Sequence, residues 1–515
     1  MYEIKNLTFR YGLENADSLK QVSLHIKKGT MTVVIGTSGS GKTTFLRHLK
    51  KELLPNGMRE GVIAYDGIPI EQLSSRRSVT EIGYLFQDPS HQMVMDTVWH
   101  EIAFGLENIG MPYGQMKRTV AEIVNYFDLQ EIYNAPTQEL SGGQKQMVNL
   151  AAITAMHPKV LVLDEPTAQL DPVSRKNFLS MIQKLQEEFQ MTVIMAVHNL
   201  EDVMEMADAC IFLKGGQVQM HGTPMEVAEY LKREKEPMKE ALPQTTRLAE
   251  IFHLAPTFSM ADIREKIGNC SYEVISKTAH RSSAILSISH LYAGYGKNQV
   301  LKNLSMEIKN QEFFAVVGAN GSGKSTLLKC TADQMKYEGK IKSKKKIVYL
   351  PQDPTVLFLK DTLLDDLKEA GCAKEEELYR LINLCGLSNQ LSTHPYDLSG
   401  GQRQMAALIK VLLAQPEVLL LDEPTKGMDR IHVRAFGKLL RRFIKEGMTV
   451  FCVSHDLEFC AEFADRVGMM FDGNIEGTDV PEKFFVDNYF FTTQTAKITR
   501  DMDNPVILPE YVRCL

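Results

Sequence analysis

The sequence has few cysteines and no long apolar run, and each shortage excludes a class of protein. Its 8 cysteines among 515 residues form no CxxC pair, and none precedes Cys210. Such spacing argues against zinc sites and disulfide frameworks and suits a reducing compartment. No window reaches the roughly 18 apolar residues of a membrane-spanning helix, and the first residues lack the regions of a secretion signal. We therefore expect a cytosolic chain that reaches a membrane only through a partner protein.

An excess of charge of one sign is also missing. The 58 Lys and Arg residues nearly balance the 64 Asp and Glu residues, which leaves a formal net charge of −6. A strongly positive surface for nucleic acid is therefore not expected, although a local basic patch is compatible with this total. A chain of 515 residues is too long for one hydrophobic core, so its length favours two to four domains.

What the chain does contain is repetition. Six phrases of the first half return in the same order in the second half. The pairs are LTFRYG and LYAGYG, GTSGSGKTT and GANGSGKST, YLFQDP and YLPQDP, LSGGQKQM and LSGGQRQM, VLVLDEPT and VLLLDEPT, and VHNLED and SHDLEF. An ordered repeat of this length predicts two homologous domains. Short β-rich runs such as MTVVIG and VLVLDE, with helical patterns between them, are typical of strands buried in a parallel sheet.

We therefore predict an α/β fold with two P-loop NTPase domains in tandem. Each has a mainly parallel sheet, a helical subdomain inserted before the LSGGQ phrase, and a small C-terminal extension. The predicted domains are residues 1–235 and 284–480, the first extension with the linker is 236–283, and the second extension is 481–515. The linker region contains KREKEPMKEALPQTTR, which breaks the apolar periodicity.

The two Gly-rich phrases fit the pattern G-x-x-x-x-G-K-[ST], each between a predicted strand and a predicted helix. Backbone N–H groups and the helix N-terminus of such a loop cradle phosphates, the Lys reaches the β- and γ-phosphates, and the Ser or Thr hydroxyl binds Mg²⁺. A flexible Gly loop is the alternative, and two matches in equivalent contexts argue against it. The predicted ATP-binding residues are Gly36, Thr37, Ser38, Gly39, Ser40, Gly41, Lys42, Thr43 and Thr44, and Gly318, Ala319, Asn320, Gly321, Ser322, Gly323, Lys324, Ser325 and Thr326.

Two adjacent carboxylates end an apolar strand in each half. Asp164 and Asp422 suit an outer-sphere hold on Mg²⁺, and the following glutamates, Glu165 and Glu423, suit polarisation of the attacking water. Solvated acids at a strand end are the alternative. The predicted metal-binding set is Thr43, Gln87 and Asp164 in the first half, and Ser325, Gln352 and Asp422 in the second.

Three further residue pairs stand beside these phrases. Gln87 and Gln352 follow a strand and suit sensing of the γ-phosphate, although an isolated Gln is usually a surface residue. The histidines His198 and His455 could donate to the γ-phosphate or could cap structure. The aromatic residues Tyr11 and Tyr295 could stack on adenine or could be ordinary sheet residues.

The ordered set resembles the ATP-binding-cassette ATPases, over almost the whole chain and as two cassettes. In that family the LSGGQ signature contacts ATP held by the opposite cassette, so the resemblance implies that the cassettes pair within one chain. Ser141, Gly142, Gly143 and Gln144 would close over ATP at Lys324, and Ser399, Gly400, Gly401 and Gln402 over ATP at Lys42. The D-loop residues would be Asp171 and Asp429; the usual preceding Ser is replaced by Ala168 and Lys426.

Both halves keep the P-loop Lys, the LSGGQ phrase, the Glu and the His, which motivates the hypothesis that both sites hydrolyse ATP. Two jobs for such an ATPase remain open. One is to power a membrane importer, and the other is to act on ribosomes or nucleic acid as a soluble tandem-cassette protein. The linker is short and mixed in charge and no zinc module is visible, so we expect no nucleic-acid partner.

The stretch FQDPSHQMVMDTVWHEIAFGLENIGMP resembles the corresponding region of energy-coupling factor (ECF) transporter ATPases. That resemblance implies an importer of a vitamin or metal ion, a peripheral place on the cytoplasmic face of the cell membrane, a transmembrane coupling protein, and a small membrane protein that binds the substrate. The apolar residues Met93, Val94, Met95, Val98 and Trp99 could dock a partner helix or pack inside the helical subdomain. The second half has a shorter match, so we expect the two halves to dock unequally.

Overall fold

A computed structural model describes residues 1–12, 16–168, 170–268, 270, 272–274, 282–296, 298–371 and 375–514. The D-loop position Gln169 and linker residues 275–281 lie outside this range. The chain divides into two compact units, Met1–Pro243 and Gln244–Leu515, each described separately below. The segment 236–283, expected to extend the first cassette, is thus split: its first eight residues belong to the first unit and the described remainder to the second.

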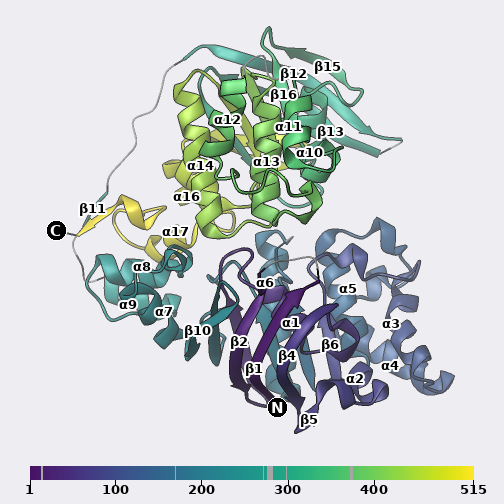
Figure 1. Cartoon of the computed structure of the whole chain (residues 1–515). Coiled ribbons are helices and arrows are strands. Elements are labelled where there is room, and N and C mark those ends of the chain that lie inside the picture. Colours follow the sequence, from purple (N-terminus) through teal and green to yellow (C-terminus); the bar gives the residue numbers. More distant parts are fainter. Residues whose placement is uncertain are drawn as a thin grey trace. The chain divides into compact units, whose positions relative to one another are not determined.

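The first unit is built on a six-stranded sheet that is parallel except at one edge (Figure 1). Its strand order is β10–β9–β3–β8–β7–β6, and only the β9–β10 pair is antiparallel. The strands are β3 (Met31–Ile35), β6 (Ile82–Leu85), β7 (Val160–Asp164), β8 (Thr192–Ala196), β9 (Ala209–Lys214) and β10 (Gln217–Gly222). Every residue of β3, β7 and β8 is buried, which explains their continuous apolar sequences.

A second, antiparallel sheet opens the unit and was not anticipated from the sequence. It contains β1 (Tyr2–Tyr11), β2 (Leu19–Ile26), β4 (Gly57–Tyr65) and β5 (Ile68–Pro69), in the order β2–β1–β4–β5. Alternate residues of β1 are buried, as a sheet with one packed face requires. The sheet packs on the same apolar cluster as β3, β7 and β8, so it carries Tyr11 to the edge of the P-loop helix.

The predicted helical insertion is confirmed. Between β6 and the signature phrase lie α3 (Val98–Asn108) and α4 (Tyr113–Tyr126), and the signature opens α5 (Gly142–Thr154). Val98, Ile102 and Leu106 form a buried stripe along α3, and the half-buried Ile109 follows its last residue. The remaining helices are α1 (Lys42–Arg47), α2 (Ser75–Glu81), α6 (Pro172–Phe189) and α7 (Pro224–Arg233).

The second unit repeats the architecture. Its six-stranded sheet has the order β16–β17–β18–β14–β19–β20, and a three-stranded antiparallel sheet has the order β13–β12–β15. The strands are β12 (Ala284–Tyr295), β13 (Asn298–Lys309), β14 (Phe313–Val317), β15 (Glu338–Lys342), β16 (Ile347–Leu350), β17 (Val418–Asp422), β18 (Thr449–Val453), β19 (Arg466–Phe471) and β20 (Asn474–Asp479). The helices are α10 (Lys324–Thr331), α11 (Leu363–Glu369), α12 (Glu375–Leu384), α13 (Gly400–Leu412), α14 (Arg430–Lys445), α15 (Leu457–Phe463) and α16 (Pro481–Asp487).

Two segments far apart in sequence form a small subdomain of the second unit, which we call the terminal subdomain. The first segment holds α8 (Gln244–Ile251), α9 (Met260–Ile267) and β11 (Tyr272–Val274), and the second holds α17 (Gln494–Thr499) and β21 (Val512–Cys514). β11 and β21 pair antiparallel, and both segments contribute to one apolar core. Across the described part of the chain, every helix is either too short or too polar to span a bilayer.

Two candidate nucleotide sites

Each P-loop joins a buried strand to a helix and holds its lysine inside the loop. In the first unit the Lys42 Nζ donates to the carbonyl oxygens of Gly36 (2.9 Å) and Thr37 (3.2 Å). In the second, Lys324 Nζ donates to those of Gly318 and Ala319, both at 2.9 Å. Both lysines are buried. The two ammonium groups therefore occupy equivalent positions in their loops. When a nucleotide binds, phosphate oxygens can replace the carbonyl oxygens as their acceptors.

The glycine before each lysine has a conformation that other residues rarely adopt. Gly41 has φ +100° and Gly323 has φ +109°, and each caps the helix that follows. A Cβ atom on Gly41 would lie 2.7 Å from the Ser18 carbonyl oxygen. One residue before each of these glycines, the hydroxyls of Ser40 and Ser322 are buried without a hydrogen-bond partner among the described residues. These unsatisfied hydroxyls inside a loop of backbone N–H groups fit a bound phosphate group.

The two aspartates are anchored in the same way. Asp164 accepts hydrogen bonds from Thr43 Oγ1 (3.1 Å) and from the Tyr84 hydroxyl (3.2 Å). Asp422 accepts them from Ser325 Oγ and Tyr349, both at 2.9 Å. The two tyrosines were not among the predicted site residues, although each lies in the repeated YLFQDP and YLPQDP phrases that could have revealed it.

These oxygens form a set that suits Mg²⁺. Hydroxyl and carboxylate oxygens are the ligands that this ion prefers, and phosphate oxygens complete its shell in nucleotide sites. Burial, together with the neighbouring Glu165 charge, raises the pKa of Asp164 to about 6. Burial likewise raises the pKa of Asp422, against the hydrogen bonds from Tyr349 and Ser325. A nearby cation would relieve this cost of buried negative charge. The residues present therefore fit a magnesium ion, which would counter that charge and bridge to the phosphates.

In the first unit, the predicted glutamate, glutamine and histidine meet at one point. His198 Nε2 lies 2.6 Å from Glu165 Oε1, and Gln87 Nε2 donates to Glu165 Oε2 at 2.9 Å. Glu165 is buried and has φ +47°, a left-handed conformation that turns its side chain away from the strand direction. Lys42 Nζ is 4.0 Å from the same carboxylate. A carboxylate held by two side chains and facing the P-loop can orient and deprotonate a water molecule.

In the second unit, only two of the three partners meet. His455 contacts Glu423 twice, from its backbone N–H to Oε2 (3.0 Å) and from Nε2 to Oε1 (3.1 Å). Glu423 has φ +48°, and burial raises its pKa while the Lys324 charge opposes that rise. Gln352 is exposed and makes no hydrogen bond with any residue that the structure describes. The second glutamate thus lacks the amide contact of the first.

The adenine-stacking candidates also differ. The Tyr11 hydroxyl lies 3.1 Å from Thr44 Oγ1, and its ring packs edge-on against Phe9 with centroids 4.9 Å apart. This contact ties the ring to the P-loop helix. Tyr295 ends β12 with 55% of its surface exposed. Both rings stand at the end of a long strand of an antiparallel sheet, and stacking on adenine remains a prediction for both.

Each signature phrase begins a helix through a capping box. Ser141 Oγ accepts the backbone N–H of Gln144 (3.3 Å), whose side chain accepts the Ser141 N–H (2.9 Å). Ser399 and Gln402 repeat the arrangement at 3.3 and 3.0 Å. This leaves Gly142, Gly143, Gly400 and Gly401 as the first residues of α5 and α13. Such a helix start favours an anion, in agreement with the predicted role, while the closure of one half's signature over the other half's ATP stays a prediction.

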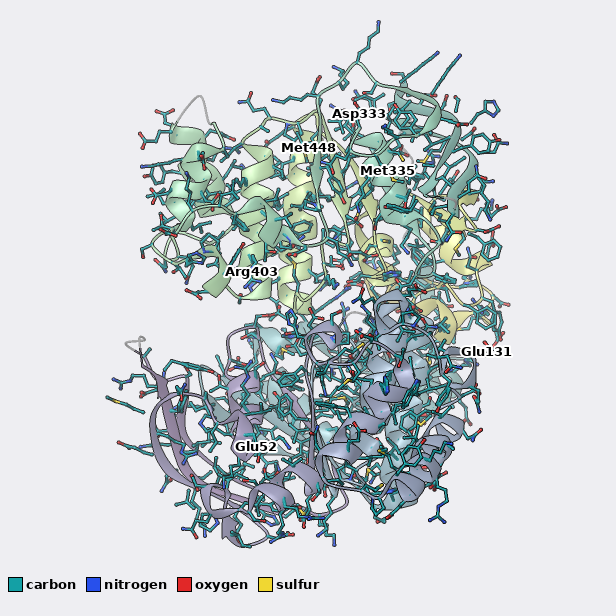
Figure 2. All side chains as sticks on the ribbon, turned by 90° about the vertical axis from the view of Figure 1, so that its right-hand side faces the viewer. Glu52, Glu131, Asp333, Met335, Arg403 and Met448 are labelled. Carbon is teal, nitrogen blue, oxygen red and sulfur yellow. The ribbon has the colours of Figure 1, made fainter. Side chains whose placement is uncertain are left out.

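The loop before the second signature has an additional clamp. Arg403, labelled in Figure 2, donates to the carbonyl oxygens of Tyr396 (2.7 Å) and Leu398 (2.8 Å). Among the residues that the structure describes, the corresponding Lys145 donates only to the Ser90 hydroxyl, at 3.5 Å. The Lys/Arg exchange inside the repeated phrase therefore changes local contacts, because a guanidinium can bridge two carbonyl groups.

The D-loop aspartates cap the next helix in each half. Asp171 accepts from the Ser174 N–H (3.1 Å) and hydroxyl (2.8 Å) at the start of α6. Asp429 accepts from the His432 N–H (3.0 Å) and lies 2.8 Å from its Nδ1 at the start of α14. The Asp429 hydrogen bond raises the pKa of His432. Both aspartates are buried, and each stabilises the start of the helix that follows it.

Comparison with known proteins identifies relatives over nearly the whole length. Residues 19–168 and 301–426 each match the family described as ABC transporter. A protein of Bacillus thuringiensis subsp. konkukian (strain 97-27), provisionally named an ABC transporter ATP-binding protein, is 39% identical over 97% of this chain and 95% of its own. A protein of Bacillus subtilis (strain 168), provisionally named an HMP/thiamine import ATP-binding protein, is 29% identical over 96% of this chain and 94% of its own.

Solved structures provide a whole-chain likeness as well. An archaeal ribosome recycling factor, solved with a ribosomal stalk protein, matches with a TM-score of 0.63 over 97% of this chain and 94% of its own. Its sequence is 21% identical, so this likeness shows the fold alone. It agrees with the tandem arrangement of two α/β units found here.

Proposed function

This chain belongs to the ABC transporter family, and we propose that it is the energy-coupling subunit of a membrane importer of the ECF type. Its two ATP-binding domains in tandem make it an ATPase. Transport coupling and the kind of importer are the proposal. A 29% identical relative provisionally named for HMP/thiamine import supports a vitamin as the cargo class.

The supporting observation is an exposed apolar loop directly after Gln87. Val94 is 62% exposed at its tip, and Met93, Met95 and Trp99 are half-buried beside it. Val98 is fully buried and belongs to the core of the helical subdomain. The packing alternative thus holds for Val98, whereas the exposed Val94 is available as a docking surface. A rigid apolar tip beside the γ-phosphate sensor is suited to receive a partner helix.

A buried carboxylate holds this loop in place. Glu101 accepts the backbone N–H groups of Val94 (2.9 Å) and Met95 (2.7 Å). In the second unit Asp366 accepts those of Leu359 and Lys360, both at 2.9 Å. Asp366 is also ion-paired with Lys410, whereas Glu101 has no Lys or Arg partner in the described part of the chain. Leu359 is 80% exposed. The loops with the exposed Val94 and Leu359 are each held by a carboxylate and differ in sequence. They are therefore suited to bind two different sites on one partner.

In the proposed cycle each P-loop holds ATP with Mg²⁺, and the signature of the other half closes over it. Glu165 and Glu423 take a proton from the attacking water. His198 and His455 donate a hydrogen bond to the γ-phosphate. Loss of that phosphate removes the shared charge, so the closed state opens and the exposed tips move their partners. The partners are a transmembrane coupling protein and a small substrate-binding membrane protein, and the chain works on the cytoplasmic face of the membrane.

Co-purification tests this proposal. We expect tagged protein from native membranes in mild detergent to bring down two small integral membrane proteins. Val94→Asp removes the apolar tip and should abolish that capture with an unchanged melting temperature. Val62→Asp is the matched control, because Val62 on β4 is also a largely exposed valine (51%), and this variant should capture both partners.

Capture of ribosomal subunits in place of membrane proteins would support the alternative, a soluble tandem-cassette ATPase that acts on ribosomes. The two outcomes share the same ATP sites, so ATP hydrolysis does not distinguish them. Loss of partners in both valine variants would show that the tip of the Gln87 loop is not a specific docking point.

A further inference from the structure

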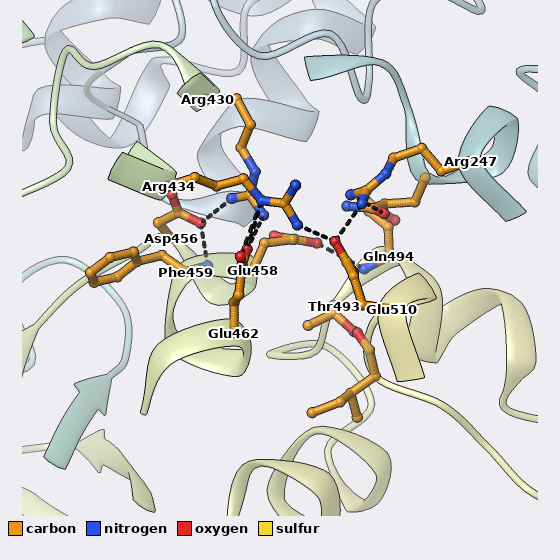
Figure 3. A network of polar contacts seen from close by, with 12 residues as sticks. Arg247, Arg430, Arg434, Asp456, Glu458, Phe459, Glu462, Thr493, Gln494 and Glu510 are labelled. Carbon is orange, nitrogen blue, oxygen red and sulfur yellow. Dashed lines mark hydrogen bonds and ion pairs between the residues drawn. The ribbon is translucent and has the colours of Figure 1, made fainter. Parts of the chain in front are cut away.

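The second unit contains a network of arginines and carboxylates that no motif of the ATP site predicts (Figure 3). Arg434 on α14 donates to Glu462 on α15 (3.1 Å) and to Glu510 near the chain end. Glu510 is also ion-paired with Arg247 on α8. Burial alone would raise the pKa of Glu510, but the Arg247 and Arg434 charges lower it overall, so the carboxylate is held as an anion.

One end of this network lies beside the catalytic motifs. Arg430, the residue after the D-loop Asp429, donates to Glu462 (3.2 Å) and lies 3.8 Å from Asp456. Asp456 directly follows His455 and caps α15 by accepting the Phe459 N–H at 2.9 Å. Arg430 and Asp456 therefore join the backbone that carries the D-loop aspartate to the backbone that carries the switch histidine.

The other end lies where the second unit begins. α8 starts at Gln244, the first residue of this unit, and Arg247 lies in its first turn. The helix is held by the shared core of the terminal subdomain, with Leu248 and Phe252 packed against Ile498 and Val506. A hydrogen bond also connects this subdomain to α15, because the backbone N–H of Gln494 donates to the Glu458 carboxylate at 3.0 Å. The covalent link from the first unit thus enters a subdomain that is tied to the helix after His455.

The first unit has different residues at three positions of this network. Pro172 stands at the position of Arg430, and Asn199 at that of Asp456. Residues 201–206, which follow His198, form turns rather than a helix, and Arg175 of α6 lies 3.9 Å from Asp202 in this segment. Lys176, at the position of Arg434, is exposed. The two switch histidines therefore have different support.

We propose that Arg430, Arg434 and Glu510 are positioning residues for the second ATP site, and that Arg247 makes this positioning depend on the segment entering from the first unit. They act through the backbone of His455 and Asp429, without touching nucleotide. Movement of the link would shift α8, the Arg247–Glu510–Arg434 chain would carry the shift to α15, and His455 would move relative to Glu423. The second site would then hydrolyse ATP in response to the state of the link, whereas the first site lacks this connection.

Single-turnover hydrolysis tests the proposal on the full-length protein. The Glu165→Gln background reports the Glu423 site, and the Glu423→Gln background reports the Glu165 site. In the first background we expect Arg434→Gln and Glu510→Gln each to slow hydrolysis by about fivefold to tenfold, with ATP affinity unchanged, because the P-loop is untouched. In the second background the same variants should change the rate by less than about twofold. Arg247→Gln should have a smaller effect at the same site.

Matched controls separate positioning from general destabilisation. Lys176→Gln removes the corresponding charge from α6 and should change neither rate. The double variant Arg434→Gln/Glu510→Gln should be no slower than the single variants, because both break one connection. Equal slowing at both sites, slowing in proportion to a loss of folded protein, or no slowing at the Glu423 site would each overturn the proposal. If the single-carboxylate backgrounds hydrolyse nothing, the test passes to steady-state kcat, which Arg434→Gln must lower and Lys176→Gln must not.

Discussion

The two ATP sites share their chemical centre and differ in what surrounds it. In both, a lysine fills the P-loop, a hydroxyl and a tyrosine hold the aspartate, and a histidine contacts the glutamate. Around this centre, the first glutamate is also bonded by Gln87, while the second site has a histidine supported by a helix and an ion-pair network. A duplicated motif set therefore does not imply duplicated control, and we expect similar chemistry at the two sites with different inputs.

The largest expected effect tests the shared centre. Glu165→Gln and Glu423→Gln remove the carboxylate that accepts the proton of the attacking water. The double variant should lower steady-state ATP turnover by about a hundredfold, and each single variant should keep only the turnover of the other site. Glu60→Gln is the control, because Glu60 is an exposed glutamate on β4. Full activity in one of the two site variants would show that only one site turns over, and the similarity of the centres would then be structural only.

The next effect concerns buried charge and pH. Because burial raises the pKa of Asp164 to about 6, above its usual value, the ionised carboxylate opposes folding above that pH and the protonated one does not. Asp164→Asn should therefore raise the free energy of unfolding by about 2 kcal/mol at pH 7.5, without nucleotide or Mg²⁺, and by little at pH 4. Denaturant unfolding at both pH values measures this.

The same shift predicts that Mg²⁺-dependent ATP binding weakens as the pH falls through about 6, because the carboxyl group becomes neutral. A stabilisation that is equal at both pH values, or ATP binding that does not weaken, would contradict the pKa shift. Asp422→Asn should behave with the same sign, since burial raises that pKa too.

The glutamines sharpen the difference between the sites. Gln87 already bonds the catalytic carboxylate, so Gln87→Ala should lower ATP turnover by about tenfold, the value of a hydrogen bond to a charged group. Gln352 has no such bond, and Gln352→Ala should lower turnover by less than about threefold. Steady-state assays at saturating ATP compare them. Equal losses would mean that nucleotide brings Gln352 to Glu423 and makes the sites alike.

The smallest expected effect is on ATP affinity. Replacement of a stacking ring by alanine should weaken binding by about fivefold, equivalent to about 1 kcal/mol, for Tyr11→Ala and Tyr295→Ala. Tyr11→Phe keeps the ring and loses only the contact with Thr44, so it should bind ATP nearly as well as the parent. Fluorescent-ATP titration measures all three variants. Unchanged affinity in Tyr11→Ala would make that ring an ordinary packing residue against Phe9.

Much of each site could be predicted because its residues lie in short phrases whose chemistry is local. A glycine before a lysine, a serine that caps a helix, or adjacent acids at a strand end are recognisable within eight residues, and each occurs twice. Tyr84 and Tyr349 could have been found by the same repeat. The different contacts of Gln87 and Gln352 could not be predicted from the sequence. The geometry of a loop after a strand depends on how the surrounding residues pack, and the amide residue itself does not determine it.

By itself, the sequence determined that the chain holds two α/β cassettes with two intact sets of nucleotide-binding residues, because repeated local patterns encode strand, loop and cap. Only the tertiary structure decided which residues support those sets. Ile267 and Ile498 pack in one core although 231 residues separate them, and Arg247 reaches Glu510 across 263. Contacts at such separations leave no periodic signal in sequence. Their pairing depends on how the whole chain buries its apolar surface, and that arrangement distinguishes the second site from the first.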